Sequence, residues 1–470
     1  MAAFPRPTAL AVSFLLLLAA CSGPDAQEPS PSPSAGTPTP ATPTAEPSVV
    51  VTGPTLAEPS YTVALRGNGG GTRWRGTQEV SFMNTGDAPI RKIWFRAWAN
   101  GVDGCDPSAI DVSAVVGGDL GRPQLDCTAL PVRLPEVLDP GERATVGFDL
   151  AIAVPERNDR FGTHQGLALM GNALPTLAVH EEGEWHLDPY VDVGDSFYSV
   201  VGRYRVALDV PSALLTAATG SLVSSTNDGN RVVRTYAARD VRDFAWAAGD
   251  LDVVRGDADG VAVTIWYQPS FMTAPRARMN LRDAVQAMTT YSEAFGAYPY
   301  GDVDVVMAAF TSFGGMEYPR LVFSNPERRV LAHELAHQWW YAVVGNDQYA
   351  EPWLDESFAT WASMLPWQPW SRCPAYRWPS PSARLTNDMG YWGGHRDEYQ
   401  TVYEGGGCML ADLADRFGLQ RFISLLRAHA RSHWLGVTTT SDFQRRVERA
   451  ADRHLDGFDA AGYWETWRVG

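Results

Sequence analysis

The spacing of apolar residues divides the chain into two parts. From about residue 56 to 255, apolar and polar residues alternate in short runs separated by Gly, Pro and Asp, a period typical of half-buried strands. The clearest runs are 77–84, 91–99, 143–154, 202–211 and 232–239. The pattern predicts a β-rich domain of about 200 residues, in which sheet packs on sheet.

From Ala274 the apolar spacing becomes helical. Residues 274–296 predict a helix that ends at Gly296. A strand at 302–310 and a glycine-rich turn at 311–319 follow this helix. Further helices are predicted at 328–344, about 355–364, 407–418, 419–431 and 440–454. One more strand is predicted at 261–269, before the helical segments. We therefore expect two folded domains, 56–255 and 256–470, with the chemistry in the second.

The N-terminus has the features of an export signal. The apolar run 9–20 follows Arg6 and is far shorter than the ~20 residues that span a bilayer. It ends in LAAC, which resembles a bacterial lipobox, so we expect residues 1–20 to be removed and Cys21 to carry lipid. Residues 21–55 are rich in Pro, Ser and Thr and predict an extended linker. An ordinary secretory signal is the alternative.

Charge and cysteine content narrow the class of protein. The formal net charge is -16, from 54 acidic and 38 basic residues, which argues against nucleic acid as a partner. An exported chain with four remaining cysteines is a candidate for disulfides. Proximity favours Cys105–Cys127 and Cys373–Cys408, although three pairings are open. Membrane contact is expected through the lipid anchor only.

The segment VLAHELAHQWW carries the candidate chemistry. His333 and His337 are four residues apart, so a helix would point both imidazoles at one ion, with Glu334 beside them as a general base. A solvated helix face with incidental histidines is the alternative. The surrounding residues are strongly apolar, and burying these polar groups without a partner would be costly. A metal ion would satisfy them.

A catalytic zinc site needs a third protein ligand and one open position. Glu356 lies nineteen residues after His337 at the start of a predicted helix, and Asp355 is the rival on spacing alone. Seven other histidines have no ligand spacing relative to this motif: His164, His180, His186, His395, His429, His433 and His454. Three nearby tryptophans are expected in the core or the pocket lining: Trp339, Trp340 and Trp353.

HELAHQWW, an eighteen-residue gap and WLDESFA resemble the gluzincin aminopeptidases, peptidase family M1, of the aminopeptidase N and leukotriene hydrolase type. That family has the pattern H-E-x-x-H-x(18)-E. FGGMEYP is similar to its G-x-M-E-N loop, and VYEGGGCMLADLADRFG to its Y-E-K-G-x-x-x-L segment. The similarity extends from about residue 195 to the C-terminus. The chain resembles a short bacterial form of the family that is made as a lipoprotein.

The resemblance implies a β-sandwich or saddle-like domain followed by a thermolysin-like, mostly helical domain. It implies one Zn²⁺ per chain held by His333, His337 and Glu356, with Glu334 as general base. The remaining implied roles concern the transition state and the substrate: Tyr403 would stabilise the oxyanion, Glu317 would bind a free α-amine, and Gly314 and Gly315 would pair with an extended peptide.

The chain departs from the family pattern at two motif positions. Tyr318 stands where the loop usually has Asn, a difference that bears on the first substrate subsite or on contacts with the peptide backbone. Gly405 replaces the lysine of Y-E-K-G. The family's long C-terminal helical domain has no counterpart before Gly470, which leaves strict exopeptidase behaviour open.

The sequence therefore predicts a zinc-dependent metallopeptidase that removes N-terminal residues from peptides. It would lie on the extracellular side of a bacterial membrane, anchored by lipid, or be secreted. An endopeptidase with the same zinc site is one alternative, and a surface binding protein with a vestigial site is another. Epoxide hydrolysis has no support beyond the shared motif.

Overall fold

The computed structural model describes residues 54–368, 373 and 376–470. Residues 52–470 form one compact unit, and the unit Met1–Val51 lies outside the described residues. The predicted signal segment, the lipid attachment at Cys21 and almost all of the linker therefore lie outside the described residues as well. In the described part, no helix has both the length and the apolar character needed to cross a membrane.

The largest sheet has the strand order β15-β16-β13-β1-β2-β7-β4. Buried and exposed residues alternate along β1 and β7, as the sequence pattern predicts for strands with one face on a core. Its strands are β1 (Leu56–Gly67), β2 (Arg73–Asn84), β4 (Ile110–Val116), β7 (Arg143–Ala153), β13 (Gly202–Pro211), β15 (Ser221–Asn227) and β16 (Arg231–Val241).

Smaller sheets complete the strand-rich half. One contains β10 (Thr176–Leu177), β3 (Ile90–Arg96), β6 (Ala129–Leu138) and β5 (Asp119–Leu120). Another contains β14 (Leu215–Ala218), β17 (Trp246–Gly249), β9 (Leu167–Met170) and β8 (Phe161–His164). A short hairpin joins β11 (His180–Glu181) and β12 (Glu184–Trp185).

A five-stranded sheet leads into the helices. Its strands, in spatial order, are β18 (Asp252–Ala258), β19 (Val261–Tyr267), β20 (Asp302–Met307), β22 (Leu321–Ser324) and β21 (Gly315–Met316). β21 forms one edge of this sheet and pairs antiparallel with β22. The expected boundary between residues 255 and 256 lies inside β18, and the division into two domains stays a prediction.

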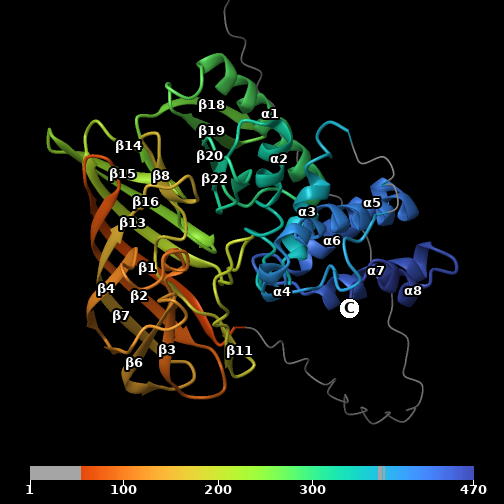
Figure 1. Cartoon of the computed structure of the whole chain (residues 1–470), viewed down its shortest axis with the longest axis horizontal. Helices are drawn as coiled ribbons and strands as arrows, with labels where there is room; N and C mark the ends of the chain where they lie inside the picture. Colours follow the sequence, from red (N-terminus) through yellow and green to blue (C-terminus); the bar gives the residue numbers. More distant parts are fainter. Residues whose placement is uncertain (1–53, 369–372, 374–375) are drawn as a thin grey trace, which may run out of the picture. The chain divides into compact units, whose positions relative to one another are not determined.

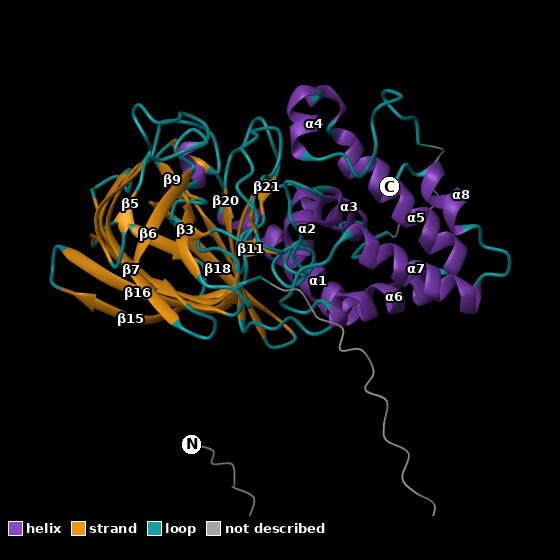
Figure 2. Cartoon of the chain, turned by 90° about the horizontal axis from the view of Figure 1, so that it is seen from below, coloured by secondary structure: helices purple, strands orange, loops and turns teal. Residues whose placement is uncertain are grey.

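The second half is mostly helical (Figures 1 and 2). Its helices are α1 (Ala274–Phe295), α2 (Arg328–Ala336), α3 (Trp353–Ala362), α4 (Met389–Gly394), α5 (Gly406–Phe417), α6 (Leu419–Ser432), α7 (Thr440–His454) and α8 (Ala460–Thr466). Single helical turns occur at Trp98–Asn100 and Arg396–Glu398, and a π-helix at Thr401–Gly405. The predicted order, a strand-rich half followed by a helical half, is confirmed.

The helix predicted over 328–344 is shorter than expected, because α2 ends at Ala336. The backbone continues in turns, and the Ala342 N–H donates to the His337 carbonyl, five residues back. Three consecutive aromatic side chains in these turns are buried: Trp339, Trp340 and Tyr341. The prediction of a longer helix was therefore wrong after Ala336.

One continuous cluster of buried side chains extends from the strands into the helices. It contains Trp339, Trp340 and Trp353, so these tryptophans are core residues, as expected. The structure pairs Cys105 with Cys127 and Cys373 with Cys408, the two pairings that proximity in sequence favours.

Candidate metal centre

Two histidines of the predicted motif lie at the C-terminal end of α2. His333 is in its last turn, and His337 is the residue that caps the helix and keeps helical backbone angles. Their Nε2 atoms are 3.1 Å apart. Leu331, Ala332 and Leu335 are buried on the same helix, so packing against the core fixes the direction of both imidazoles.

Glu356 from α3 completes the cluster. Its Oε2 atom lies 3.0 Å from His333 Nε2 and 3.5 Å from His337 Nε2. Every residue of α3 is buried, so this helix cannot rotate to move the carboxylate away. Burial raises the pKa of Glu356, but the two adjacent imidazoles outweigh burial and hold that pKa well below its usual value. The carboxylate is therefore ionised.

The outer nitrogens of both imidazoles have their own partners. His337 Nδ1 lies 3.0 Å from the carbonyl oxygen of Trp340, and His333 Nδ1 lies 3.4 Å from the Thr360 hydroxyl. A proton on each Nδ1 leaves the Nε2 lone pairs directed at the centre of the cluster. Two such nitrogens and one carboxylate oxygen are a donor set that suits Zn²⁺. The residues present therefore fit the metal.

Asp355, the rival ligand on spacing, has other contacts. Its carboxylate accepts hydrogen bonds from Gln348 Nε2 at 2.6 Å and from Asn346 Nδ2 at 3.2 Å. Burial raises its pKa to about 7. It belongs to a neighbouring group with Glu317 and His337, whereas Glu356 is the carboxylate grouped with both histidines.

Glu334 is buried beside this cluster, with 5% of its surface exposed. Burial is the main reason that its pKa is raised to about 8. Gly315, in β21, allows the close approach of this side chain, since a Cβ atom at Gly315 would lie 2.6 Å from Glu334 Cδ. Gly314 lies against Val330, and its carbonyl oxygen accepts a hydrogen bond from the Asn325 N–H.

Tyr403 reaches the cluster from the π-helix Thr401–Gly405. Its hydroxyl donates to Glu356 Oε1 at 2.9 Å, and its ring centroid lies 5.9 Å from that of His333. Nothing in the apolar spacing predicts a π-helix. Such turns are rare, and they are frequent at functional sites. The phenol is therefore held beside the carboxylate that contacts both imidazoles.

Glu317 follows β21 and is 2% exposed. Gln348 Nε2 donates to its Oε1 at 3.1 Å and is thereby shared between Glu317 and Asp355. Burial raises the pKa of Glu317 well above its usual value. The structure thus brings Glu317 to the same region as His337, as part of a second group of close donor atoms.

Two glutamines of this region were missed by the sequence analysis. Gln338 is fully buried: its amide donates to the carbonyls of Glu317 and Tyr318, and its oxygen accepts from Tyr298 and the Arg320 N–H. A polar residue inside AHQWWYA is the signal that could have revealed it. Gln348 has no comparable signal.

The described residues contain a further cluster away from this centre. His186 Nδ1 lies 3.0 Å from Asp347 Oδ2, and its Nε2 lies 3.2 Å from Glu181 Oε1. Asp188 is close enough to form a metal-type group with His186 and Asp347. The two carboxylates that flank the imidazole already satisfy both of its nitrogens, so the contacts of His186 need no ion.

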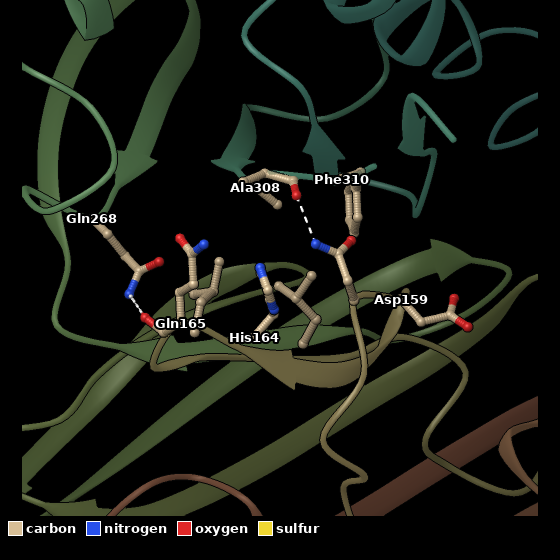
Figure 3. A pocket seen from close by; sticks show the side chains of 10 residues that line it. Asp159, His164, Gln165, Gln268, Ala308 and Phe310 are labelled. Atoms are coloured by element: carbon tan, nitrogen blue, oxygen red, sulfur yellow. Dashed lines mark hydrogen bonds between the residues drawn. The ribbon is translucent and has the colours of Figure 1, made fainter. Parts of the chain in front are cut away.

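A small cavity lies among residues near β8, β9 and the end of β20 (Figure 3). The space open to a water-sized molecule is about 20 Å³, enough for about one water. Gln268 Nε2 donates to the Gln165 carbonyl at its rim. His333, His337 and Glu356 do not line it, so this cavity is not the metal centre.

Comparisons with known proteins identify relatives in sequence and in fold. Residues 279–371 match the family model described as the Peptidase family M1 domain. Aminopeptidase N of Streptomyces lividans is 23% identical over 246 residues, which are 44% of this chain and 28% of that protein. Human aminopeptidase B is 32% identical over 128 residues, 25% of this chain and 19% of that protein. The chain thus covers less than a third of the length of either relative.

A solved structure of an M1 zinc metallopeptidase variant from Deinococcus radiodurans, bound to a Tyr-Ser-Ala substrate, has the same fold. The TM-score is 0.66 at 18% identity, and the match covers 88% of this chain and 94% of that chain. The matched domain at residues 279–371, the curated relatives and this shared fold together support a relationship to peptidase family M1, the gluzincin aminopeptidases.

Proposed function

We propose that the protein is a zinc-dependent aminopeptidase, with one Zn²⁺ held by His333, His337 and Glu356. The observation that carries the proposal is the approach of Glu356 Oε2 to within 3.0 and 3.5 Å of the two imidazole nitrogens, which are 3.1 Å from each other. The M1 domain match and the aminopeptidase names of the relatives support it.

When bound, Zn²⁺ supplies Lewis acidity, which makes water a stronger acid and polarises a carbonyl group. Glu334 is the general base in this proposal: its buried carboxylate accepts a proton from the attacking water and transfers it to the leaving amine. Its position beside the cluster, against the bare Cα of Gly315, supports this role.

Tyr403 is proposed to donate a hydrogen bond to the oxyanion that develops at the attacked carbonyl. Its hydroxyl now donates to Glu356, and a rotation of that O–H would redirect it to a substrate oxygen. Such a donor accelerates the reaction because the contact is strongest in the transition state.

Glu317 is proposed to bind the free α-amine of a peptide. Its carboxyl group is buried and accepts one hydrogen bond from Gln348, and an incoming ammonium group would favour its ionised form with little competing water. Gly315 lies in the edge strand β21, where an extended peptide could add as a further strand. The Gly314 carbonyl already accepts the Asn325 N–H, which favours Gly315 for this contact.

The proposal includes a location. The lipobox-like cysteine Cys21 and the linker 21–55 support a lipid-anchored protein on the extracellular side of a bacterial membrane. We expect the wild-type protein in the membrane fraction and a Cys21→Ser variant in a soluble or unprocessed form. Equal membrane recovery of both proteins would argue against the anchor.

Hydrolysis of aminoacyl-anilides, measured with and without a chelator, tests the activity. We expect cleavage that the chelator abolishes and added Zn²⁺ restores. An endopeptidase with the same site would also cut N-acetylated peptides, which an aminopeptidase leaves intact. A binding protein with a vestigial site would cleave neither substrate, and that result would overturn the proposal.

A further inference from the structure

Glu317 and Tyr318 are adjacent, but their side chains have partners in different parts of the molecule. Glu317 accepts from Gln348, in the segment between α2 and α3. Tyr318 donates to Asn172, which is 146 residues away in the strand-rich half. The proline at 319 restricts Tyr318 to extended backbone, where neighbouring side chains point in opposite directions. Tyr318 is fully buried, and its hydroxyl contacts the strand-rich half.

The Tyr318 hydroxyl begins a buried chain of hydrogen bonds. It donates to Asn172 Oδ1 at 2.6 Å, and Asn172 Nδ2 donates to Asp243 Oδ2 at 2.8 Å. Asp243 Oδ1 in turn accepts the Phe244 N–H at 2.6 Å. Asn172 and Asp243 are each 4% exposed. Hydrogen bonds that are shielded from water in this way are costly to break, because each freed group stays buried without a partner.

The space around the Tyr318 hydroxyl matches this chain. A Cβ atom at Gly171 would lie 2.0 Å from the hydroxyl oxygen, so only glycine leaves room for the phenol. Asn172 has a φ of 53°, a left-handed conformation that asparagine adopts more readily than most residues. Gly171 and Asn172, two consecutive residues of the strand-rich half, therefore make room for the Tyr318 hydroxyl and bind it.

Gln338 holds the backbone of Glu317 and Tyr318 by a second attachment, because its amide donates to the carbonyls of both residues. Gln338 fixes the backbone relative to α2, and the Tyr318 hydroxyl fixes it relative to the strands. Glu317 lies between these two attachments.

We propose that Tyr318 is a positioning residue for amine recognition: anchored on Asn172 and Asp243, it holds the backbone of Glu317 where the carboxylate meets the α-amine of a peptide. This assignment rests on the proposed function. A tyrosine that only fills the core would affect stability and leave amine binding unchanged.

The test is the steady-state kinetics of the full chain on an aminoacyl-anilide. Tyr318→Phe removes the hydroxyl and keeps the ring. We expect KM to rise about tenfold while kcat changes little, because the amine contact is made equally in the ground state and the transition state. Asn172→Gly, which tolerates the left-handed backbone, should have the same effect. The two substitutions together should raise KM no further.

Tyr236→Phe is the matched control. That buried tyrosine donates to the Thr216 carbonyl at 2.8 Å, within the strand-rich half, so its loss should lower the melting temperature similarly and leave KM unchanged. A Glu317→Gln background completes the cycle, and there Tyr318→Phe should have no further effect on KM.

Two results would overturn the positioning role. One is a KM for Tyr318→Phe that equals that of Tyr236→Phe. The other is an equal rise in KM with and without Glu317. Failure of Glu317→Gln to raise KM would instead refute the amine site itself, and absence of any cleavage by the wild-type protein would refute the proposed function and with it this assignment.

Discussion

At the scale of single residues, the centre is a group of three possible metal-ligand atoms that lie close to one another. The two Nε2 atoms and Glu356 Oε2 face one another, while the outer atoms of the same side chains are held by the Trp340 carbonyl and the Tyr403 hydroxyl. Outer partners of this kind fix the orientation of ligands before an ion binds. The geometry is thus organised for a cation in advance.

Glu334→Gln removes the proposed base and keeps the shape of the side chain. We expect bound zinc to stay at the wild-type level and kcat to fall by ~10²–10⁴-fold, because a positioned base contributes that much to proton transfer. Metal analysis and anilide hydrolysis on the same preparation measure both quantities. Glu327→Gln, at the exposed start of the same helix, is the control and should keep full activity. Retained turnover in Glu334→Gln would refute the base assignment.

The sequence predicts the centre better than its surroundings. The positions of His333, Glu334 and His337 match helical spacing. The need for a third ligand leaves Glu356 and Asp355 open, and the family resemblance selects Glu356. The contacts of Gln348 and Tyr318 could not be predicted, because their partners are distant in sequence: Asn172 is 146 residues from Tyr318. Pairings over such separations depend on how the halves pack, which local periodicity does not encode.

At the scale of elements, α3 is held in place by α5 and the π-helix beside it. The Ser357 hydroxyl donates to the Val402 carbonyl at 2.5 Å, and Gly406 lies against Ser357. A Cβ atom at Gly406 would lie 1.8 Å from Ser357 Oγ. The absence of a side chain at Gly406 thus sets how close α5 comes to the helix that carries Glu356.

Gly406→Ala should therefore destabilise the protein, although alanine is the better helix former. We expect the free energy of unfolding to fall by about 1–3 kcal/mol, the usual cost of overpacking a core. Urea denaturation measures this change. Gly394→Ala is the control, since its Cβ would enter open space at the exposed end of α4, and it should change stability by less than about 0.5 kcal/mol. Equal stability of the two variants would contradict the proposed contact.

The elements themselves were predicted unevenly. The bounds of β13 and α7 match the sequence prediction, because each has a clear period between turn or capping residues. The helix predicted over 328–344 ends early because the backbone leaves the α-helical hydrogen-bond pattern after Ala336, where the Ala342 N–H donates to the His337 carbonyl. The π-helix Thr401–Gly405 has no signature in apolar spacing.

At the scale of the whole molecule, the segment between α2 and α3 is attached to the strand-rich half. The Gln348 N–H donates to the Phe197 carbonyl, and His186 bridges Asp347 and Glu181. Hydrogen bonds that the imidazole donates to Asp347 and then to Glu181 raise the pKa of His186 from 6.5 to about 10, against the opposing effect of burial. The imidazole is therefore charged in the folded protein near neutral pH.

This raised pKa predicts how stability depends on pH. The pKa of His186 is higher in the folded protein than in the unfolded chain, so the charged imidazole stabilises the folded state fully below pH about 6.5. That contribution is lost as the pH rises through about 10. Wild-type protein should thus lose more unfolding free energy between about pH 6 and pH 10 than His186→Gln does, by roughly 1 kcal/mol for a partly exposed network. His454→Gln, at an exposed position, should behave like the wild type. Parallel pH profiles for wild type and His186→Gln would contradict this account.

The most direct test of the central claim is the metal content of purified protein after reconstitution with Zn²⁺ and dialysis. We predict one Zn²⁺ per wild-type chain, loss of that ion in Glu356→Ala, and its retention in Asp355→Asn, because only Glu356 contacts both imidazoles. A wild-type chain that retains no zinc, or a Glu356→Ala variant that binds it as tightly, would contradict the account.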